Sequence, residues 1–522
     1  MRLQSYVEGR WQDGAGEGRP LVNPTTGEVL ASADSSGLDL ASAMAHAREM
    51  GGGALRAMSF AERGALLKSI ADALAAQRAR YEEIARLNSG NTKADAAIDI
   101  DGGIGTLRYY ARLGQSLGGA RHILEAGQDQ LVKEPIFFAR HLWTSRPGVA
   151  LQINAFNFPS WGLWEKVAAA TLAGVPSVAK PATATALLSH AMVKDVIAAG
   201  VLPAGALSLI CGSGEGVLDA LQGADSVAFT GSAATGLQVH AHPTVQISRA
   251  RVTIEADSLN ATVLGPDAGS GTALFDLALR EATKALSVKA GQLCTNIRRV
   301  FVPRDHVAAF VEALRAAAEK LKVGDPADES VRVGPLVNKR QQAEAQDGVG
   351  KLAVEARIVA GGAAPQGLDP DLATNGAFFA PTILFCADPS AARAVHEVEV
   401  FGPCLTIMPY DGLSDLATLA ARGGGSLAMS LFANDPSLHV AAALALGPWH
   451  GRLMIVDESV GAKHTGHAIV MPQCVHGGPG RAGGGEELGG LRGLRLHMQR
   501  SAVQGSPATL AALAKDAAEA AL

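Results

Sequence analysis

The stretch from Lys289 to Asn296 carries a single cysteine, Cys294, three residues after Gly291. A helical pattern over residues 273–289 leads into it, and the apolar run 299–302 follows. The pattern predicts that the thiol lies on a loop, where substrate can reach it and where it can act as a nucleophile. The alternative interpretation is a small buried apolar side chain, which is the usual role of a lone cysteine.

Two polar residues at predicted strand ends could act on a group bound beside such a thiol. The segment 154–159 follows one such strand and contains Asn154 and Asn157, and an asparagine amide there could donate to an oxyanion or cap the following helix. Glu255 ends the apolar run 252–254. A carboxylate that enters a core needs a partner or a raised pKa, and a raised pKa is what a general base needs. The alternative is a strand-end residue that faces water.

Two segments have chemistry suited to a nucleotide. The run 229–236, Phe-Thr-Gly-Ser-Ala-Ala-Thr-Gly, lies between a predicted strand and a predicted helix. Glycine and the free N–H groups of a helix N-terminus can receive a phosphate there. Lys180 ends another predicted strand and could bond ribose hydroxyls or phosphate. An ordinary βα turn and a solvated loop lysine are the alternatives.

Strand and helix patterns alternate through the middle of the chain and predict a parallel sheet covered by helices on both faces. Such sheets bind ligands outside the carboxyl ends of their strands. The predicted strands are 148–153, 175–179, 206–210, 226–230 and 251–255, and the predicted helices between them are 185–200, 216–222 and 234–240.

Helices are also expected before this region, and a second α/β region after it. The helical patterns cover residues 38–50, 59–88 and 94–118, with Gly51-Gly52-Gly53 as a linker between the first two. The second α/β region spans about 265–460 and leads to a glycine-dense loop over 476–490. Within that loop we expect Glu486 and Glu487 to be solvated. A strand over 494–503 and a short helix capped by Ser506 are expected to end the chain.

Composition excludes several functions. Among 522 residues, 48% are hydrophobic, the net charge is −5 and the pI is near 6.3, so no basic surface for nucleic acid is expected. Five widely spaced cysteines without a CxxC pair indicate a reducing, cytoplasmic location and neither disulfides nor a metal site. The first residues have no apolar core of signal-peptide length. No run of 18 apolar residues exists, so no membrane span is expected.

Several short motifs together give the chain a resemblance to the aldehyde dehydrogenase superfamily over nearly its whole length. They occur in the order and approximate spacing of that family. The motifs are Asn157-Phe158-Pro159, Lys180-Pro181, Phe229-Thr230-Gly231-Ser232, Glu255, Gly291-Gln292-Leu293-Cys294 and Glu399-Val400-Phe401-Gly402-Pro403.

The resemblance implies a fold and a set of roles. The fold would be α/β, with a Rossmann-type cofactor domain (1–128 and 148–262), an α/β catalytic domain (263–475) and a small β oligomerisation arm (129–147 and 490–505). Cys294 would attack the aldehyde, Asn157 and the Cys294 backbone N–H would hold the oxyanion, and Glu255 would activate the hydrolytic water. The implied cofactor residues are Phe156, Lys180, Gly214, Thr230, Gly231, Ser232, Glu399 and Phe401.

Two departures from the family pattern bear on specificity. Thr183 stands where relatives that prefer NAD often carry a glutamate, so a 2′-phosphate would not be repelled and NADP is expected, with NAD weaker. The stretch 476–490, with residues 497–507, resembles the aldehyde dehydrogenase domain of the bifunctional phenylacetate ring-opening enzymes, which act on CoA-linked semialdehydes. Its glycines could leave room for a thioester arm, or could form a flexible surface loop.

The sequence therefore predicts an acid-forming dehydrogenase of a CoA-linked semialdehyde that assembles as a homodimer, because the arm has sheet edges that need partners. The alternatives are a dehydrogenase of a free aldehyde, a CoA-acylating dehydrogenase, and a catalytically silent homologue that acts as a scaffold.

Overall fold

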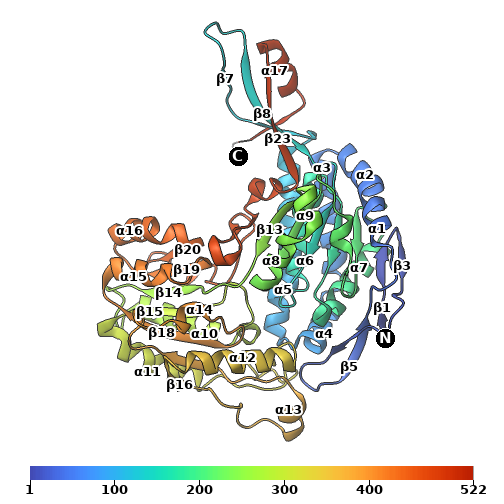
Figure 1. The fold of residues 1–522 in the computed structure, drawn as a ribbon. Coiled ribbons are helices and arrows are strands. Elements are labelled where there is room, and N and C mark those ends of the chain that lie inside the picture. Colours follow the sequence, from blue (N-terminus) through green and yellow to red (C-terminus); the bar gives the residue numbers. More distant parts are fainter. Residues whose placement is uncertain (521–522) are drawn as a thin grey trace.

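The computed structural model describes residues 1–520, and two seven-stranded sheets form its two main bodies (Figure 1). The first sheet has the order β13-β12-β9-β10-β11-β2-β3, and β13 to β11 are parallel. Its strands are β2 (Ser5–Val7), β3 (Arg10–Gln12), β9 (Ala150–Ile153), β10 (Ser177–Lys180), β11 (Leu207–Leu209), β12 (Ser226–Thr230) and β13 (Arg251–Glu255). The five parallel strands confirm the α/β prediction.

Helices cover both faces of this sheet, and each face has its own apolar core. One face carries α3 (Phe60–Ala75), α4 (Arg78–Ser89), α5 (Lys93–Leu117), α6 (Trp161–Ala173), η2 (Thr183–Thr185) and α7 (Ala186–Ala198). The other carries α1 (Leu40–His46), η1 (Ala47–Gly51), α2 (Gly52–Ala57), η3 (Val217–Ala220), α8 (Ala233–Ala241) and α9 (Pro243–Ser248). The carboxyl ends of the five parallel strands meet at one edge of the sheet, which is where sheets of this kind bind ligands.

The second sheet has the order β16-β17-β18-β15-β14-β19-β20, parallel except for β16. Its strands are β14 (Ala261–Leu264), β15 (Arg299–Pro303), β16 (Arg357–Ala360), β17 (Thr382–Phe385), β18 (Cys404–Tyr410), β19 (Ser426–Phe432) and β20 (His450–Val456). Its helices are α10 (Ala273–Ala285), η4 (Val288–Gly291), η5 (Arg304–His306), α11 (Val307–Ala318), α12 (Lys339–Leu352), α13 (Pro370–Asn375), α14 (Ala394–Glu397), α15 (Gly412–Ala421), α16 (Pro436–Leu446), η6 (Gly447–Trp449) and η7 (Gly461–Lys463).

A narrow arm projects from the first body and contains the predicted hairpin and the predicted last helix (Figure 1). Its elements are β6 (Ile123–Glu125), β7 (Asp129–Gln130), β8 (Phe138–Ser145), β23 (Met498–Gly505), α17 (Pro507–Ala514) and β24 (Ala518–Ala520). The remaining short elements are β1 (Arg2–Leu3), β4 (Arg19–Val22), β5 (Val29–Ala33), β21 (Val475–Gly477), η8 (Gly480–Ala482), β22 (Glu486–Leu488) and η9 (Gly490–Leu494). No helix among residues 1–520 is long and apolar enough to cross a bilayer.

Three local predictions were wrong. The helical pattern over 59–88 divides into α3 and α4, and residues 217–220 form only a 3₁₀ turn. The glycine run 51–53 is not a linker, because helical structure continues through it to Ala57. Gly51 is needed for close packing instead: a Cβ on it would lie 2.1 Å from the carbonyl oxygen of Gly205.

Gly51→Ala should lower the thermal midpoint, because the added methyl group meets backbone that cannot move aside; overpacking of this kind costs about 1–3 kcal/mol. Gly53→Ala is the matched control. A Cβ on Gly53 meets nothing within 4 Å, so alanine should raise helix stability by about 0.5–1 kcal/mol. Thermal unfolding of both variants checks this, and equal midpoints would contradict the packing argument.

Candidate active site

The loop that carries Cys294 leaves α10 through a strained turn. Two non-glycine residues of this turn have left-handed backbone, Lys289 at φ 48° and Ala290 at φ 49°. Each such residue stores about 1–3 kcal/mol of strain and persists only where the surroundings hold it. The turn ends four residues before Cys294. Its left-handed backbone conformation directs the chain from α10 into the site.

Buried polar side chains hold this loop by its carbonyl groups. Asn260 Nδ2 donates to the Cys294 carbonyl oxygen at 2.7 Å. Arg298 donates to the carbonyl oxygens of Gly291 at 3.0 Å and Leu293 at 3.3 Å. Since both donors are buried, breaking these bonds would leave unpaired polar groups in the core. The thiol is therefore held in a fixed position.

The Cys294 thiol meets two functional groups from distant parts of the chain, the Glu255 carboxylate and the His476 imidazole. Cys294 Sγ lies 3.9 Å from His476 Nε2, and the same nitrogen lies 3.0 Å from Glu255 Oε2. One nitrogen of His476, the sulfur of Cys294 and one carboxylate oxygen of Glu255 all lie within 4.8 Å of one another. Glu255 is 4% exposed and His476 7% exposed, so the contact is shielded from solvent. The structure thus brings the predicted Cys294 and Glu255 together and adds a histidine that the sequence analysis did not single out.

The three groups shift one another's pKa. Burial alone would raise the pKa of Glu255, but the charge of His476 and its hydrogen bond lower it to about 2. Burial would lower the pKa of His476, whereas Glu255 raises it above its ordinary value. Burial and then the Glu255 carboxylate raise the pKa of the Cys294 thiol well above its usual range. Glu255 therefore has the partner that burial requires, but its pKa is lowered and not raised as a general base would need. It is an anion, while Cys294 rests as a thiol.

The amide of Asn157 faces the same small cavity of about 50 Å³. Its Nδ2 is buried and donates to no described residue. An unpaired buried donor costs about 1–3 kcal/mol, a cost that a ligand oxygen would relieve. Asn157 is thus available to an oxyanion formed beside Cys294.

A second group of buried charges adjoins the cavity, which Glu165 and Lys166 line. Lys166 Nζ contacts Glu165 Oε1 at 3.1 Å and Glu487 Oε2 at 3.0 Å. Burial alone would lower the pKa of Lys166, but the two carboxylates raise it above its ordinary value. The prediction that Glu487 is solvated was wrong: its side chain is 10% exposed, and burial raises its pKa.

Glycines in the segment 476–490 bring these charged residues to the sheet. A Cβ on Gly483 would lie 2.2 Å from the carbonyl oxygen of Ile254, and one on Gly477 would lie 1.9 Å from that of Gly485. The backbone N–H of Ala256 donates to the carbonyl oxygen of Ala482 at 3.0 Å. The segment packs against the end of β13, so these glycines serve close packing.

A groove of about 850 Å³ runs along the carboxyl edge of the first sheet and reaches Cys294. Seven of the eight predicted cofactor residues line it: Phe156, Lys180, Thr230, Gly231, Ser232, Glu399 and Phe401. The eighth, Gly214, does not line the groove. It backs the Lys180 side chain, where a Cβ would lie 3.1 Å from Lys180 Cγ.

The groove has features that fit a dinucleotide. Ser232 is the N-cap of α8 and lines the groove, so the helix presents its N-terminus there. The buried hydroxyl of Thr230 has no partner among the described residues. Glu399 accepts from the Ser258 backbone N–H at 3.1 Å and from Arg298 Nε at 3.3 Å, which fixes its carboxylate beside the groove.

Sequence reasoning missed Arg19 and Arg481, which also line the groove. It also missed His476 and Lys166. His476 stands at the head of the glycine-dense segment and was a visible signal, since imidazoles titrate near neutral pH. The other three have no local pattern that distinguishes them from surface or core residues.

Comparison with known proteins gives the class. The sequence model of the aldehyde dehydrogenase family matches residues 11–487, and the chain belongs to that family. A putative aldehyde dehydrogenase from Burkholderia cenocepacia has a similar structure, with a TM-score of 0.82, 26% identity and 97% of each chain covered. Betaine aldehyde dehydrogenase from Staphylococcus aureus, solved with NAD+, gives 0.82 and 25% identity, with 96% of this chain and 94% of that one covered.

A more similar sequence is 3,4-dehydroadipyl-CoA semialdehyde dehydrogenase from Aromatoleum evansii. It is 48% identical over 485 residues, which are 92% of this chain and 93% of that protein. Protein MaoC from Klebsiella aerogenes is 48% identical over 181 residues, or 35% of this chain and 52% of that protein. The chain is an aldehyde dehydrogenase.

Lys166→Met should destabilise the protein by about 3–5 kcal/mol, because it leaves Glu165 and Glu487 as unpaired buried carboxylates. Lys322→Met is the control, since the Lys322–Asp328 pair is about half exposed and such pairs contribute below about 1 kcal/mol. Thermal or denaturant unfolding measures both. Equal small losses would show that the Lys166 cluster is hydrated.

Proposed function

We propose that the protein oxidises a CoA-linked semialdehyde, 3,4-didehydroadipyl-CoA semialdehyde, to its carboxylic acid with NADP, as a step in the breakdown of benzoate. The observation that carries the chemistry is the meeting of Cys294, Glu255 and the unpaired amide of Asn157 at one small cavity beside the groove. Support for the substrate comes from the relative named 3,4-dehydroadipyl-CoA semialdehyde dehydrogenase, which matches over nearly the whole chain.

Cys294 is the nucleophile in this proposal. Its thiolate attacks the aldehyde carbon and forms a thiohemiacetal, while the Asn157 amide and the Cys294 backbone N–H donate to the oxyanion. NADP, when bound, would supply the hydride acceptor that leaves a thioester on the Cys294 sulfur. The thiolate must be generated within the site, because burial keeps the pKa of the thiol high.

Glu255 activates the water that hydrolyses the thioester. Its Oε2 is occupied by His476, but its Oε1 accepts no hydrogen bond from a described residue, so that oxygen is available to a water proton. A CoA-acylating enzyme needs no such base, because free CoA takes the acyl group. A carboxylate held beside Cys294 therefore favours the acid as product.

The NADP preference rests on the charges at the end of β10. Lys180 and Arg19 both line the groove, and Thr183 supplies no carboxylate there. Burial, and then the positive charge of Arg19, lower the pKa of Lys180. Among the described residues, its Nζ donates only to the Pro181 carbonyl oxygen, at 3.4 Å. A 2′-phosphate would pair with both cations and raise the pKa of Lys180 again.

The arm supports a homodimer. Among residues 1–520, β23 pairs with β8 on one side only, and the backbone groups of its other edge would need a partner. Large apolar side chains are also exposed at the tip of the arm: Leu131, Val132, Ile136 and Phe137. A second copy of the chain would cover both.

The direct test is absorbance of the reduced nicotinamide, with NADP or NAD and with either the CoA-linked semialdehyde or a free aldehyde of similar length. We expect rapid turnover only for NADP with the CoA form, and none for Cys294→Ala, which should still bind NADP. Equal turnover of the free aldehyde would remove the CoA assignment. Full activity of Cys294→Ala would remove the nucleophile.

Lys180→Ala should raise the KM for NADP about 10- to 150-fold, because a charged hydrogen bond to phosphate contributes about 1.5–3 kcal/mol. The KM for NAD should change much less, since NAD has no 2′-phosphate. Arg19→Ala should act in the same direction. Equal losses for both cofactors would contradict the 2′-phosphate argument.

A further inference from the structure

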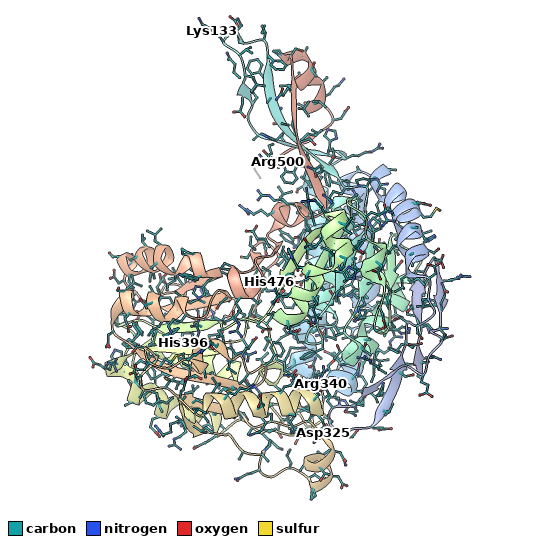
Figure 2. All side chains as sticks on the ribbon, viewed as in Figure 1. Lys133, Asp325, Arg340, His396, His476 and Arg500 are labelled. Atoms are coloured by element: carbon teal, nitrogen blue, oxygen red, sulfur yellow. The ribbon has the colours of Figure 1, made fainter. Side chains whose placement is uncertain are left out.

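Arg481 lines the cofactor groove from a turn that is held on both sides. It belongs to η8, in the C-terminal segment that Figure 2 labels at His476, where the segment passes between the two bodies. The Arg481 backbone N–H donates to the Gly424 carbonyl oxygen of the second body at 2.8 Å. The carbonyl oxygen of the next residue, Ala482, accepts from the Ala256 N–H of the first body at 3.0 Å. The position of Arg481 in the groove is therefore fixed by its backbone.

The guanidinium lies close to the carboxylates of the groove. Arg481 Nη2 is 3.8 Å from Asp257 Oδ2. Burial raises the pKa of Glu399 and Arg298 lowers it, while Asp257 and Arg481 act on it in opposite directions. Among residues 1–520 the guanidinium makes one hydrogen bond, to the Glu397 carbonyl oxygen at 2.6 Å. A guanidinium has five N–H donors, so donors remain for a ligand in the groove.

Asp257 brings a negative charge to the N-terminus of α8. Its Oδ1 accepts from the backbone N–H of Ala233, the first residue of α8, at 3.1 Å. The Ser232 hydroxyl accepts from the Thr235 N–H at 3.3 Å. Two N–H groups of the first turn are therefore already bonded, one of them to an anion. A diphosphate would be attracted to this helix end but repelled by the carboxylate beside it, so it needs a further cation there.

The other cations that line the groove lie away from this helix end. Lys180 ends β10, which lies two positions from β12 in the sheet, a distance of about 10 Å at the usual strand spacing. Arg19 lies near Lys180, whose pKa is lowered by burial and then by the charge of Arg19. Arg340 is paired with Glu344 and its side chain is 83% exposed. Arg481 is therefore the groove cation placed beside the start of α8.

We propose that Arg481 binds the diphosphate of the nicotinamide dinucleotide and offsets the charge of Asp257 at the same place. The N–H groups that Glu397 leaves unused would donate to phosphate oxygens. The two residues act in opposite senses, because Arg481 strengthens binding and Asp257 weakens it. The inference rests on the proposed use of a nicotinamide dinucleotide. It applies to NADP and NAD alike, since both contain the diphosphate.

The test is the dissociation constants of NADP and NAD for Arg481→Ala, measured by isothermal titration calorimetry without substrate. We expect both constants to rise by the same factor of about ten or more, because one charged hydrogen bond to phosphate is lost. The factor should fall as salt is added. Binding of 2′-AMP, which has no diphosphate, should not change. Unchanged affinity for both dinucleotides, or an equal loss for 2′-AMP, would overturn the inference.

Asp257→Asn gives the opposite prediction. Asparagine keeps an oxygen that can accept from the Ala233 N–H, but it has no charge. Both dinucleotides should bind about two- to fivefold more tightly, the effect of one partly exposed charge. The double variant should bind them more tightly than Arg481→Ala alone. Weaker binding by Asp257→Asn would contradict the assigned opposition between this carboxylate and the diphosphate.

Arg304→Ala controls for the loss of a paired arginine. Arg304 contacts Asp411 in the second body and does not line the groove, so its affinities should match those of the wild type. Lys180→Ala separates this inference from the proposed NADP preference, because it should weaken NADP and 2′-AMP but not NAD. Equal losses of NADP and NAD in Lys180→Ala would remove that preference and leave Arg481 in place. A loss confined to NADP in Arg481→Ala would overturn the diphosphate assignment.

Discussion

The fold of this enzyme depends on burying charged groups where its two bodies meet. Glu255 is the last residue of β13 in the first sheet. Cys294 lies on the loop that follows α10 and η4 in the second body. Glu255 could not stay in place alone, because an unpaired carboxylate in a dry site costs several kcal/mol. The segment 475–488 supplies the partners, His476 for Glu255 and Glu487 for Lys166.

Backbone packing makes these pairs possible. The glycines of that segment let its backbone approach β13 more closely than any side chain would allow. The strained turn at Lys289 and Ala290 is held in a similar way, by Asn260 and Arg298 on the loop carbonyls. In the glycine segment and in the strained turn, buried hydrogen bonds offset the free-energy cost of an unfavourable backbone conformation. They hold the Cys294 thiol beside the Glu255 carboxylate.

Much of this could be predicted from the sequence. The strand patterns of the first sheet were regular, so Lys180, Thr230 and Glu255 could be placed at its carboxyl edge. Cys294 and Asn157 followed from their motifs and face the same cavity in the structure. The family and the α/β fold are confirmed, while the roles of single residues and the domain boundaries stay predictions.

The failures share a physical cause. The pairing of His476 with Glu255 joins segments far apart in the chain, and no local periodicity records it. Glu487 was assigned to solvent because adjacent acidic residues usually face water, and only the buried Lys166 reverses that. Gly51 was assigned to a linker. Its close contact with Gly205 is also long-range, so no local pattern indicated it. Local patterns predict elements, but packing decides which polar groups become buried.

The most direct measurement is mass spectrometry of Glu255→Gln after it has reacted with NADP and the CoA-linked semialdehyde. Without the base that activates water, the thioester should accumulate. The peptide that carries Cys294 should gain the mass of the aldehyde less two hydrogens, in about one copy per chain. A label on another residue, or an unmodified Cys294 in an enzyme that still reduces NADP, would contradict the central claim.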